Sequence, residues 1–391
     1  MDMNINILSD SEVQTLNEII ENAQNIVICC HKSPDGDALG SSLGWANFLT
    51  VCGKSPTIVV PDAYPDFLQW MPGANAIVRY DKHTEQATTL LQNADLVFCL
   101  DFNGSDRVDE MKDALEASPA KKVMIDHHLD PKMQTVLTVS YPNMSSTSEL
   151  VFRIIWQLGK FDDMPKECAV NIYCGMMTDT GGFTYNSTQP EIFFIISQLL
   201  TKGIDKDRIY RNVFNNFSHW AIRLRGYLMS QKLNVFSDLH ASYFTISRRD
   251  MREYHFIKGD AEGLVNEPLR IKNMKLSVSL REDDRRDNLI WVSLRAVGNF
   301  RYITDDNPAL LLHMMSKTVS GSSIIESGDE REQKRIISDI INQTRLCGIP
   351  KAFRDTIDRA ASASGNKTEI KAIDEDGSIY NHRDHRYWGG R

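Results

Sequence analysis

The chain has 391 residues, of which 42% are hydrophobic and 25% are charged, and its formal net charge is −8. This length is sufficient for two or three domains with cores of their own. It contains no run of eighteen apolar residues that could span a membrane, and its acidic balance argues against a broad basic surface for long nucleic acids.

The cysteines and the N-terminal sequence indicate a reducing compartment. The seven cysteines include no CxxC pair, which is typical of small buried side chains rather than of disulfides or a zinc site. The first residues, MDMNINILSDSEV, lack the basic region and apolar stretch of a secretory signal. We therefore expect a cytoplasmic protein.

A first group of polar residues follows a short apolar strand. The β-branched run Asn25–Cys30 predicts a buried strand of a parallel sheet, and Ala38–Cys52 predicts the helix after it. His31, Asp35 and Asp37 lie between or just inside these elements, at the carboxyl end of a strand, where open α/β sheets bind ligands. Neighbouring carboxylates ionise together only with a cation, and this ligand set suits Mn²⁺ or Mg²⁺. The alternative is a solvated turn, with the two aspartates as turn former and helix N-cap.

Two further predicted strands end in residues of the same kind. The run beginning at Asp95 ends in Asp101, and the run beginning at Lys122 ends in Asp126, His127 and His128. Predicted helices alternate with these strands, as in a doubly wound parallel sheet. The carboxyl ends of parallel strands meet at one edge, so we expect all of these side chains on that edge.

Two later segments carry further candidate groups. Ser146–Glu149 has the spacing of a capping box before an apolar helix, and we expect exposed hydroxyls there that could also touch a phosphate. The apolar helix Cys168–Met177 leads to Asp179, which is followed by two glycines. Such a turn allows a backbone to approach a ligand closely.

The second half of the chain predicts another α/β unit. The segments Ala241–Ser247, Lys275–Arg281 and Leu289–Arg295 are typical of strands, and the last two each end in Ser-Leu-Arg. A strand-end arginine is often only solvated, whereas one that faces a cleft can bind phosphate. Arg295 is the stronger candidate, because the charged run after Arg281 indicates a solvated hairpin tip.

The candidate groups together predict a site for two divalent cations. Two cations that share a bridging carboxylate can activate water and neutralise the oxygens of a phosphoryl group. No P-loop or GxSxG motif competes for this function. The groups are His31, Asp35, Asp37, Asp101, Asp126, His127, His128 and Asp179.

Four segments of the chain resemble the motifs of the DHH phosphoesterase superfamily, in the family's order. They are HKSPDGDALGSSLG, VFCLDFN, MIDHHLDP and MMTDTGGF, and they span Asn25–Phe183. Residues 241–295 resemble the associated C-terminal (DHHA1) domain. Within the superfamily, the likeness is greatest to bacterial bifunctional oligoribonuclease and 3′-phosphoadenosine-5′-phosphate (pAp) phosphatase proteins.

The resemblance implies a role for each motif residue. It implies two Mn²⁺ ions, with Mg²⁺ or Co²⁺ as alternatives. Asp101 would bridge the ions, His128 would face the scissile phosphate and Asp126 would orient the histidines. The remaining ligands would be His31 and Asp35 on one ion, and Asp37, His127 and Asp179 on the other.

The predicted fold is α/β, with a doubly wound parallel sheet joined by helices to a smaller, incomplete α/β domain. We expect the long helices Glu191–Lys202 and Ile209–Leu228 to connect the two lobes. The predicted division is a DHH catalytic domain at 1–188, a helical connector at 189–232, a DHHA1-like substrate-binding domain at 233–300, and an atypical, partly disordered tail at 301–391.

The C-terminal part departs from the family pattern. The glycine-rich GGGH segment that normally follows the second Ser-Leu-Arg strand is missing, and the resemblance ends near Phe300. We therefore hypothesise a reading-frame change or a replacement near Phe300, with a tail that metal binding does not need.

These inferences predict a metal-dependent phosphohydrolase that uses two metals to activate water. The expected substrates are short oligoribonucleotides or pAp, and neither a long nucleic acid nor a membrane is an expected partner. Two alternatives stay open: the same chemistry on linear dinucleotides, pyrophosphate or polyphosphate, and a metal-binding protein with impaired catalysis. A homodimer is also left open.

Overall fold

The computed structural model describes residues 4–237, 240–257, 259–261, 263–284, 290–296, 370–373 and 379–381. The chain divides into two units, Met1–Asn216 and Phe217–Arg391, and each is described by itself. The four-part division expected from the sequence stays a prediction.

The first unit contains a six-stranded sheet whose order is β3-β2-β1-β4-β5-β6. All of its strand pairs are parallel. The strand order reverses between β1 and β4, so the position where open α/β sheets bind ligands lies at the carboxyl ends of these two strands. The strands are β1 (Ile26–Cys29), β2 (Thr57–Val60), β3 (Val78–Arg79), β4 (Leu96–Leu100), β5 (Lys121–Asp126) and β6 (Leu137–Ser140).

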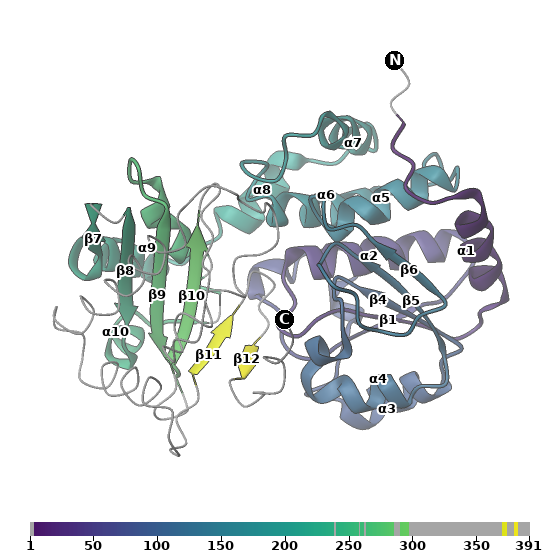
Figure 1. Cartoon of the computed structure of the whole chain (residues 1–391), viewed down its shortest axis with the longest axis horizontal. Helices are drawn as coiled ribbons and strands as arrows, with labels where there is room; N and C mark the ends of the chain where they lie inside the picture. The colour runs from purple at the N-terminus through teal and green to yellow at the C-terminus, as the bar shows by residue number, and fades with distance from the viewer. Residues whose placement is uncertain are drawn as a thin grey trace, which may run out of the picture. The chain divides into compact units, whose positions relative to one another are not determined.

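Helices cover both faces of this sheet, which confirms the α/β class (Figure 1). Alternate residues of β1 enter two separate cores: Ile28 packs with side chains of α2, α5 and α6, and Val27 packs with side chains of α3 and α4. A strand buried on both faces must be apolar throughout, as β1 and β4 are. The helices are α1 (Asp10–Asn22), α2 (Gly36–Val51), α3 (Thr84–Asn93), α4 (Lys112–Ala117), α5 (Thr147–Gln157) and α6 (Lys166–Asp179).

Helices α2 and α6 approach each other through glycines. A Cβ atom on Gly40 of α2 would lie 2.7 Å from the Cα of Gly175 on α6. A Cβ atom on Gly175 would overlap Ser148 Oγ and lie 3.0 Å from Asp37 Oδ1. Larger side chains would separate the helices, so these glycines allow α2, α5 and α6 to converge beside the carboxyl edge of the sheet.

Two more helices complete the first unit, and a break follows them. They are α7 (Pro190–Thr201) and α8 (Lys206–Phe214). The predicted single helix over Ile209–Leu228 is wrong, because α8 ends at Phe214 and α9 (His219–Tyr227) starts anew. Ser218 is the N-cap of α9, where its side chain accepts a hydrogen bond from the N–H of Ala221 at 3.0 Å.

The second unit contains a mixed six-stranded sheet of order β12-β11-β10-β9-β8-β7. The three strands expected between residues 241 and 295 are present as β8, β9 and β10, with α10 (Arg248–Glu253) and the short η6 (Leu264–Arg270) between β8 and β9. The strands are β7 (Asn234–Phe236), β8 (Ala241–Ile246), β9 (Leu276–Glu282), β10 (Ile290–Ala296), β11 (Ile370–Ile373) and β12 (Ile379–Asn381).

Two short strands come from the tail. β11 pairs parallel with β10, and β12 pairs antiparallel with β11. The other residues after Ala296 lie outside the described part of the chain. The expected disorder of 301–391 and the hypothesis of a reading-frame change near Phe300 therefore stay predictions.

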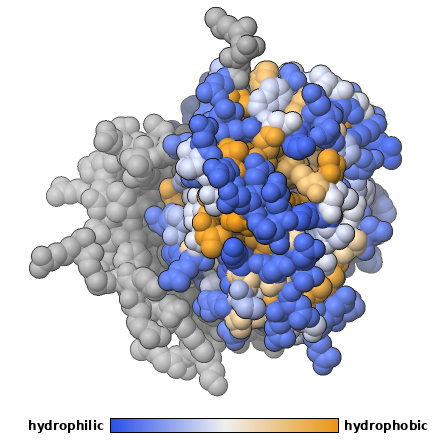
Figure 2. All heavy atoms as spheres, turned by 90° about the vertical axis from the view of Figure 1, so that its right-hand side faces the viewer, coloured by the Kyte–Doolittle hydropathy of each residue, from blue (hydrophilic) through white to orange (hydrophobic). Residues whose placement is uncertain are grey.

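Within the described residues, no helix combines the length and the apolar character needed to cross a bilayer. The face of the first unit shown in Figure 2 is mostly hydrophilic, with small groups of hydrophobic side chains between the polar ones.

Candidate metal centre

The predicted ligands come from five places at the carboxyl edge of the first sheet. Loops after three strands provide most of them, the first turn of α2 provides one, and the last residue of α6 provides another. In chain order, the residues are His31 and Asp35 after β1, Asp37 on α2, Asp101 after β4, His127 after β5 and Asp179 on α6. The structure brings all six together.

The first cluster contains His31, Asp35 and Asp101, whose ligand atoms all lie within 4.8 Å of one another. His31 is fully buried. Its Nε2 lies 3.5 Å from Asp101 Oδ2 and 3.9 Å from Asp35 Oδ1. Asp35 is also the N-cap of α2, because its Oδ1 accepts hydrogen bonds from the N–H groups of Asp37 and Ala38. The capping role and the cluster position are thus compatible.

The second cluster contains Asp37, His127 and Asp179. His127 Nε2 lies 3.6 Å from Asp179 Oδ2 and 4.0 Å from Asp37 Oδ2. The close approach of α2 and α6 at Gly40 and Gly175 brings the two carboxylates, from different helices, to one imidazole.

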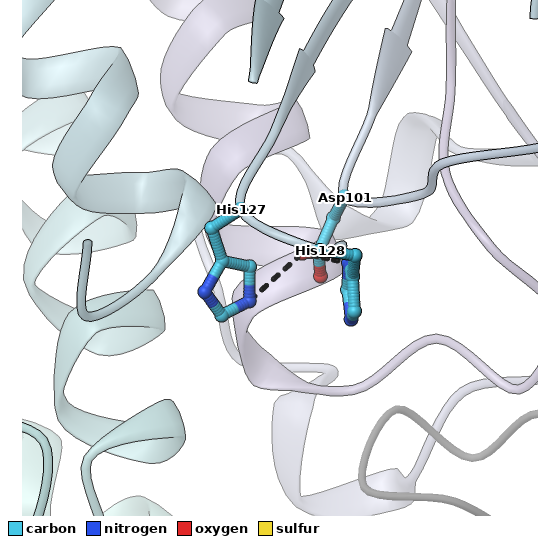
Figure 3. A group of neighbouring side chains, drawn as sticks. All are labelled: Asp101, His127 and His128. Atoms are coloured by element: carbon cyan, nitrogen blue, oxygen red, sulfur yellow. Dashed lines mark ion pairs between the residues drawn. The ribbon is translucent and has the colours of Figure 1, made fainter. Parts of the chain in front are cut away.

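Asp101 lies between the two clusters. Its Oδ2 faces His31, and its Oδ1 lies 3.6 Å from His127 Nε2. Figure 3 shows His127 and His128 directed toward this carboxylate. Asp101 has a φ of +65°, the left-handed conformation that costs most residues free energy but that aspartate tolerates. Such strain occurs at functional sites, where the surrounding contacts maintain it.

His128 and Asp126 form a pair beside the clusters. His128 Nδ1 lies 2.7 Å from Asp126 Oδ1, and 3.9 Å from Asp101 Oδ1. Asp126 is fully buried at the end of β5. Because a carboxylate accepts hydrogen bonds, it fixes Nδ1 of His128 as the protonated nitrogen.

The start of α5 supports the site in a way that the sequence analysis missed. The hydroxyls of residues 146–148 were expected to be exposed, but these three residues are fully buried. The capping-box expectation is confirmed in one half only: Ser146 is the N-cap and its Oγ accepts from the Glu149 N–H, but the Glu149 carboxylate accepts from Ser145. Thr147 and Ser148 instead donate their N–H groups to Asp37, at 2.7 and 2.9 Å.

The buried charges shift the pKa values strongly. Burial opposes protonation of His31, but Asp101 and Asp35 outweigh it and raise the pKa of His31 to about 9. Burial likewise opposes protonation of His127, yet Asp179, Asp101 and Asp37 raise its pKa to about 10. Burial would raise the pKa of Asp101, but the histidines hold it well below its usual range.

The pKa of Asp37 shifts in the opposite direction to that of Asp101. Burial and the neighbouring charges of Asp101 and Asp179 raise it well above the ordinary value. A site in which one carboxylate resists ionisation while two imidazoles favour protonation has an excess of negative charge. A bound cation would relieve this excess.

The donor atoms fit divalent cations. His31 Nδ1 lies 2.8 Å from the carbonyl oxygen of Lys32, so Nδ1 carries the hydrogen. His31 Nε2 is buried without a hydrogen-bond partner among the described residues, and it faces carboxylate oxygens at 3.5 and 3.9 Å. Ligands about 2.1 Å from one shared ion are separated by about 3–4 Å, so these spacings fit a cation of the Mg²⁺ or Mn²⁺ kind.

The predicted substrate arginines lie in the second unit. Arg281 is on β9 and Arg295 is on β10, and the register places both side chains on the same face of that sheet. Arg281 is half-buried, with its guanidinium 5.3 Å from the ring centre of Phe256, and burial lowers its pKa. Asp283 beside it is buried, so the expectation of a solvated tip is wrong at this residue.

Arg107 is a further residue near the site that none of the sequence motifs indicated. It lies on η3 (Ser105–Met111), and its carbonyl oxygen accepts a hydrogen bond from the Lys32 N–H at 2.8 Å. Its charge acts on His31, so it is a cationic side chain near the first cluster. In the sequence, only its position six residues after Asp101 indicated that Arg107 could lie near the first cluster.

Comparison with known proteins matches residues 25–176 to the DHH family, N-terminal domain. The bifunctional oligoribonuclease and PAP phosphatase NrnA of Thermus thermophilus is 28% identical over 290 residues, which are 73% of this chain and 80% of that protein. The cyclic-di-AMP phosphodiesterase GdpP of Bacillus subtilis is 26% identical over 206 residues, which are 49% of this chain and 30% of that protein.

A solved structure is also similar. An exopolyphosphatase-related protein from Bacteroides fragilis is 43% identical, with a TM-score of 0.75, and the match covers 87% of this chain and 98% of that one. The likeness therefore extends over both units rather than over the first sheet alone.

The fold and the site define an α/β protein with a candidate centre for divalent cations at the switch point of a parallel sheet. The chain belongs to the DHH family. Family membership and the relatives support a metal-dependent phosphohydrolase.

Proposed function

We propose that this protein is a Mn²⁺-dependent phosphohydrolase that acts on short oligoribonucleotides and on pAp. The position of Asp101 carries the proposal. One of its oxygens lies 3.5 Å from His31 Nε2, and the other lies 3.6 Å from His127 Nε2. A carboxylate between two ligand clusters suits a bridge between two cations.

The proposed ligands divide into two sets around this bridge. His31 and Asp35 would hold one cation, Asp37, His127 and Asp179 would hold the other, and Asp101 would contact both. When bound, the cations supply activation of water and neutralisation of phosphoryl oxygens. The protein's own task is to hold six ligand side chains from five segments in one place.

His128 and Asp126 are proposed to act on the phosphate. The Asp126 carboxylate holds Nδ1 of His128 at 2.7 Å, so Nε2 is the nitrogen that would meet a phosphoryl oxygen. In the imidazolium form, in which both ring nitrogens carry hydrogen, a histidine oriented in this way can donate a proton or a hydrogen bond from Nε2 to the reacting group. Arg295 and, more weakly, Arg281 are proposed to bind a terminal phosphate of the substrate.

The choice of substrate rests on the relatives and on charge. The NrnA proteins are named for oligoribonuclease and PAP phosphatase activity, and a net charge of −8 disfavours a long polyanion. Two relatives support a second candidate, with the same chemistry on linear dinucleotides, pyrophosphate or polyphosphate. One is named a cyclic-di-AMP phosphodiesterase and the other is exopolyphosphatase-related.

The test is a substrate panel with the full chain. Purified protein is incubated with Mn²⁺, Mg²⁺ or Co²⁺ and with a 5′-labelled RNA dinucleotide, pAp, a linear di-adenylate, pyrophosphate or polyphosphate. We expect mononucleotide or phosphate release from the first two substrates, fastest with Mn²⁺. No release from either would contradict the proposal, and bound Mn²⁺ without any turnover would select the catalytically impaired alternative.

A further inference from the structure

Thr147 contacts the proposed bridge, Asp101, and a carboxylate of the second proposed cation set, Asp37. Its N–H donates to Asp37 Oδ2 at 2.7 Å, and its hydroxyl Oγ1 donates to Asp101 Oδ1 at 2.8 Å. Asp37 and Asp101 come from α2 and from the loop after β4, so the sheet alone does not fix their separation. All three residues are at most 2% exposed, which excludes water as a competing partner for these bonds.

The hydroxyl of Thr147 is not needed to start the helix. The N-cap of α5 is Ser146, whose side chain accepts the Glu149 N–H at 3.0 Å. Thr147 is therefore the first helical residue, and most side chains are accepted at that position. Its buried hydroxyl is directed instead to an aspartate 46 residues earlier in the chain.

The N–H groups at the start of α5 donate to a single side chain, the carboxylate of Asp37. Thr147 and Ser148 donate to the two different oxygens of the Asp37 carboxylate. The positive end of an 11-residue helix thus meets a buried carboxylate of another element. Because these donors belong to the backbone, a substitution of the Thr147 side chain leaves them in place and affects Asp101 alone.

We infer that Thr147 is a positioning residue that ties Asp101 to Asp37 of the second cation set and so holds Asp101 in its bridging orientation. This inference rests on the proposed function for the identity of the bridge. The hydroxyl keeps Oδ1 of Asp101 directed toward the second set, and leaves Oδ2 directed toward His31. Residues that support a metal ligand in this way commonly change metal affinity by about 10–100-fold when they are replaced.

The test compares three variants of the full chain. Thr147→Val has nearly the same shape but no hydroxyl, Thr147→Ser keeps the hydroxyl, and Thr245→Val places the same change at a buried threonine of the second unit. Mn²⁺ binding is measured by calorimetric titration and by the spin coupling between the two ions in electron paramagnetic resonance. The increase of the melting temperature on addition of Mn²⁺ is a second measurement.

We expect Thr147→Val to bind Mn²⁺ about 10–100-fold more weakly, with reduced spin coupling and a smaller increase of the melting temperature. Thr147→Ser and Thr245→Val should bind like the wild type. A merely structural role would lower the melting temperature equally with and without Mn²⁺. If the valine variant does not fold, Thr147→Ala removes the same hydroxyl without adding a methyl group in its place.

Equal Mn²⁺ affinity and spin coupling in the wild type and the hydroxyl-free variants would overturn the inference. The proposed function fails separately, if the wild type binds two ions but hydrolyses none of the substrates. The comparison of the Thr147 variants still decides the inference in that case, because it is made on binding and not on turnover.

Discussion

Asp101→Asn tests the centre most directly, because asparagine changes the charge of the proposed bridge and little else. Asparagine tolerates the left-handed conformation that Asp101 adopts at φ +65°, whereas alanine would add backbone strain. The amide also keeps an oxygen that can accept the Thr147 hydroxyl hydrogen bond. A loss of function in this variant would therefore report on charge.

The size of the effect follows from the two contacts of the Asp101 carboxylate. It faces the His31 set with one oxygen and the His127 set with the other. If each charge-assisted contact stabilises the transition state by about 1.5–3 kcal/mol, the loss of both removes about 3–6 kcal/mol of that stabilisation. Since 1.4 kcal/mol is a factor of ten, we expect kcat/KM for pAp to fall by about 10²–10⁴-fold.

Two assays separate this prediction from misfolding. Calorimetry should show weaker binding of both Mn²⁺ ions, and an NMR titration of the chelator-treated protein should show lower pKa values for His31 and His127, since the Asp101 charge helps to raise both. Asp130→Asn is a matched control, because Asp130 is an exposed aspartate with a φ of +57°. Wild-type turnover and two tightly bound ions in Asp101→Asn would refute the bridging role.

Three further predictions concern the other groups. His127→Ala should weaken Mn²⁺ binding, whereas His128→Ala should bind Mn²⁺ normally and hydrolyse substrate far more slowly. Equal Mn²⁺ affinities in titrations of the two variants would contradict the assignment of His127 to the metal and of His128 to the phosphate. Because His31 and His127 have pKa values of about 9 and 10 without metal, both are protonated at pH 7, and Mn²⁺ must displace their protons. Affinity should therefore rise as the pH increases toward 9, with release of protons on binding at pH 7. Calorimetric heats that are the same in buffers of different ionisation enthalpy would exclude this release. Arg295→Ala should raise KM for pAp roughly ten-fold or more, and an unchanged KM would make this residue structural.

The sheet and the proposed ligands could be predicted because one local rule governs both. β1 and β4 are continuous apolar runs, as strands covered on both faces must be. A polar residue that ends such a run lies at the carboxyl edge, so His31 and Asp101 could be placed together before any contact was known. The rule concerns only the order of apolar and polar residues, which the sequence displays directly.

The break between α8 and α9 was missed because the apolar pattern of a helix continues across it. Val213 and Leu224 are both buried, as they would be on one helix, yet the chain turns between Phe214 and Ser218 and enters the second unit. Periodicity records which residues are buried and not which core buries them. The pattern of buried residues therefore does not indicate a boundary at which the chain leaves one core and enters another.

Thr147 shows a different limit, because a threonine at the start of a helix already has a sufficient local explanation. Its hydroxyl could cap its own helix, face solvent or bond elsewhere, and the sequence does not distinguish these cases. The choice depends on Asp37 and Asp101, which are 110 and 46 residues away and which reach Thr147 only when α2, α5 and β4 are assembled. Candidate ligands can thus be proposed from where strands end, whereas residues that would hold them in place depend on contacts between elements. Residues of the second kind are found only from the structure, and Thr147, which contacts both Asp37 and Asp101, is the one proposed at this site.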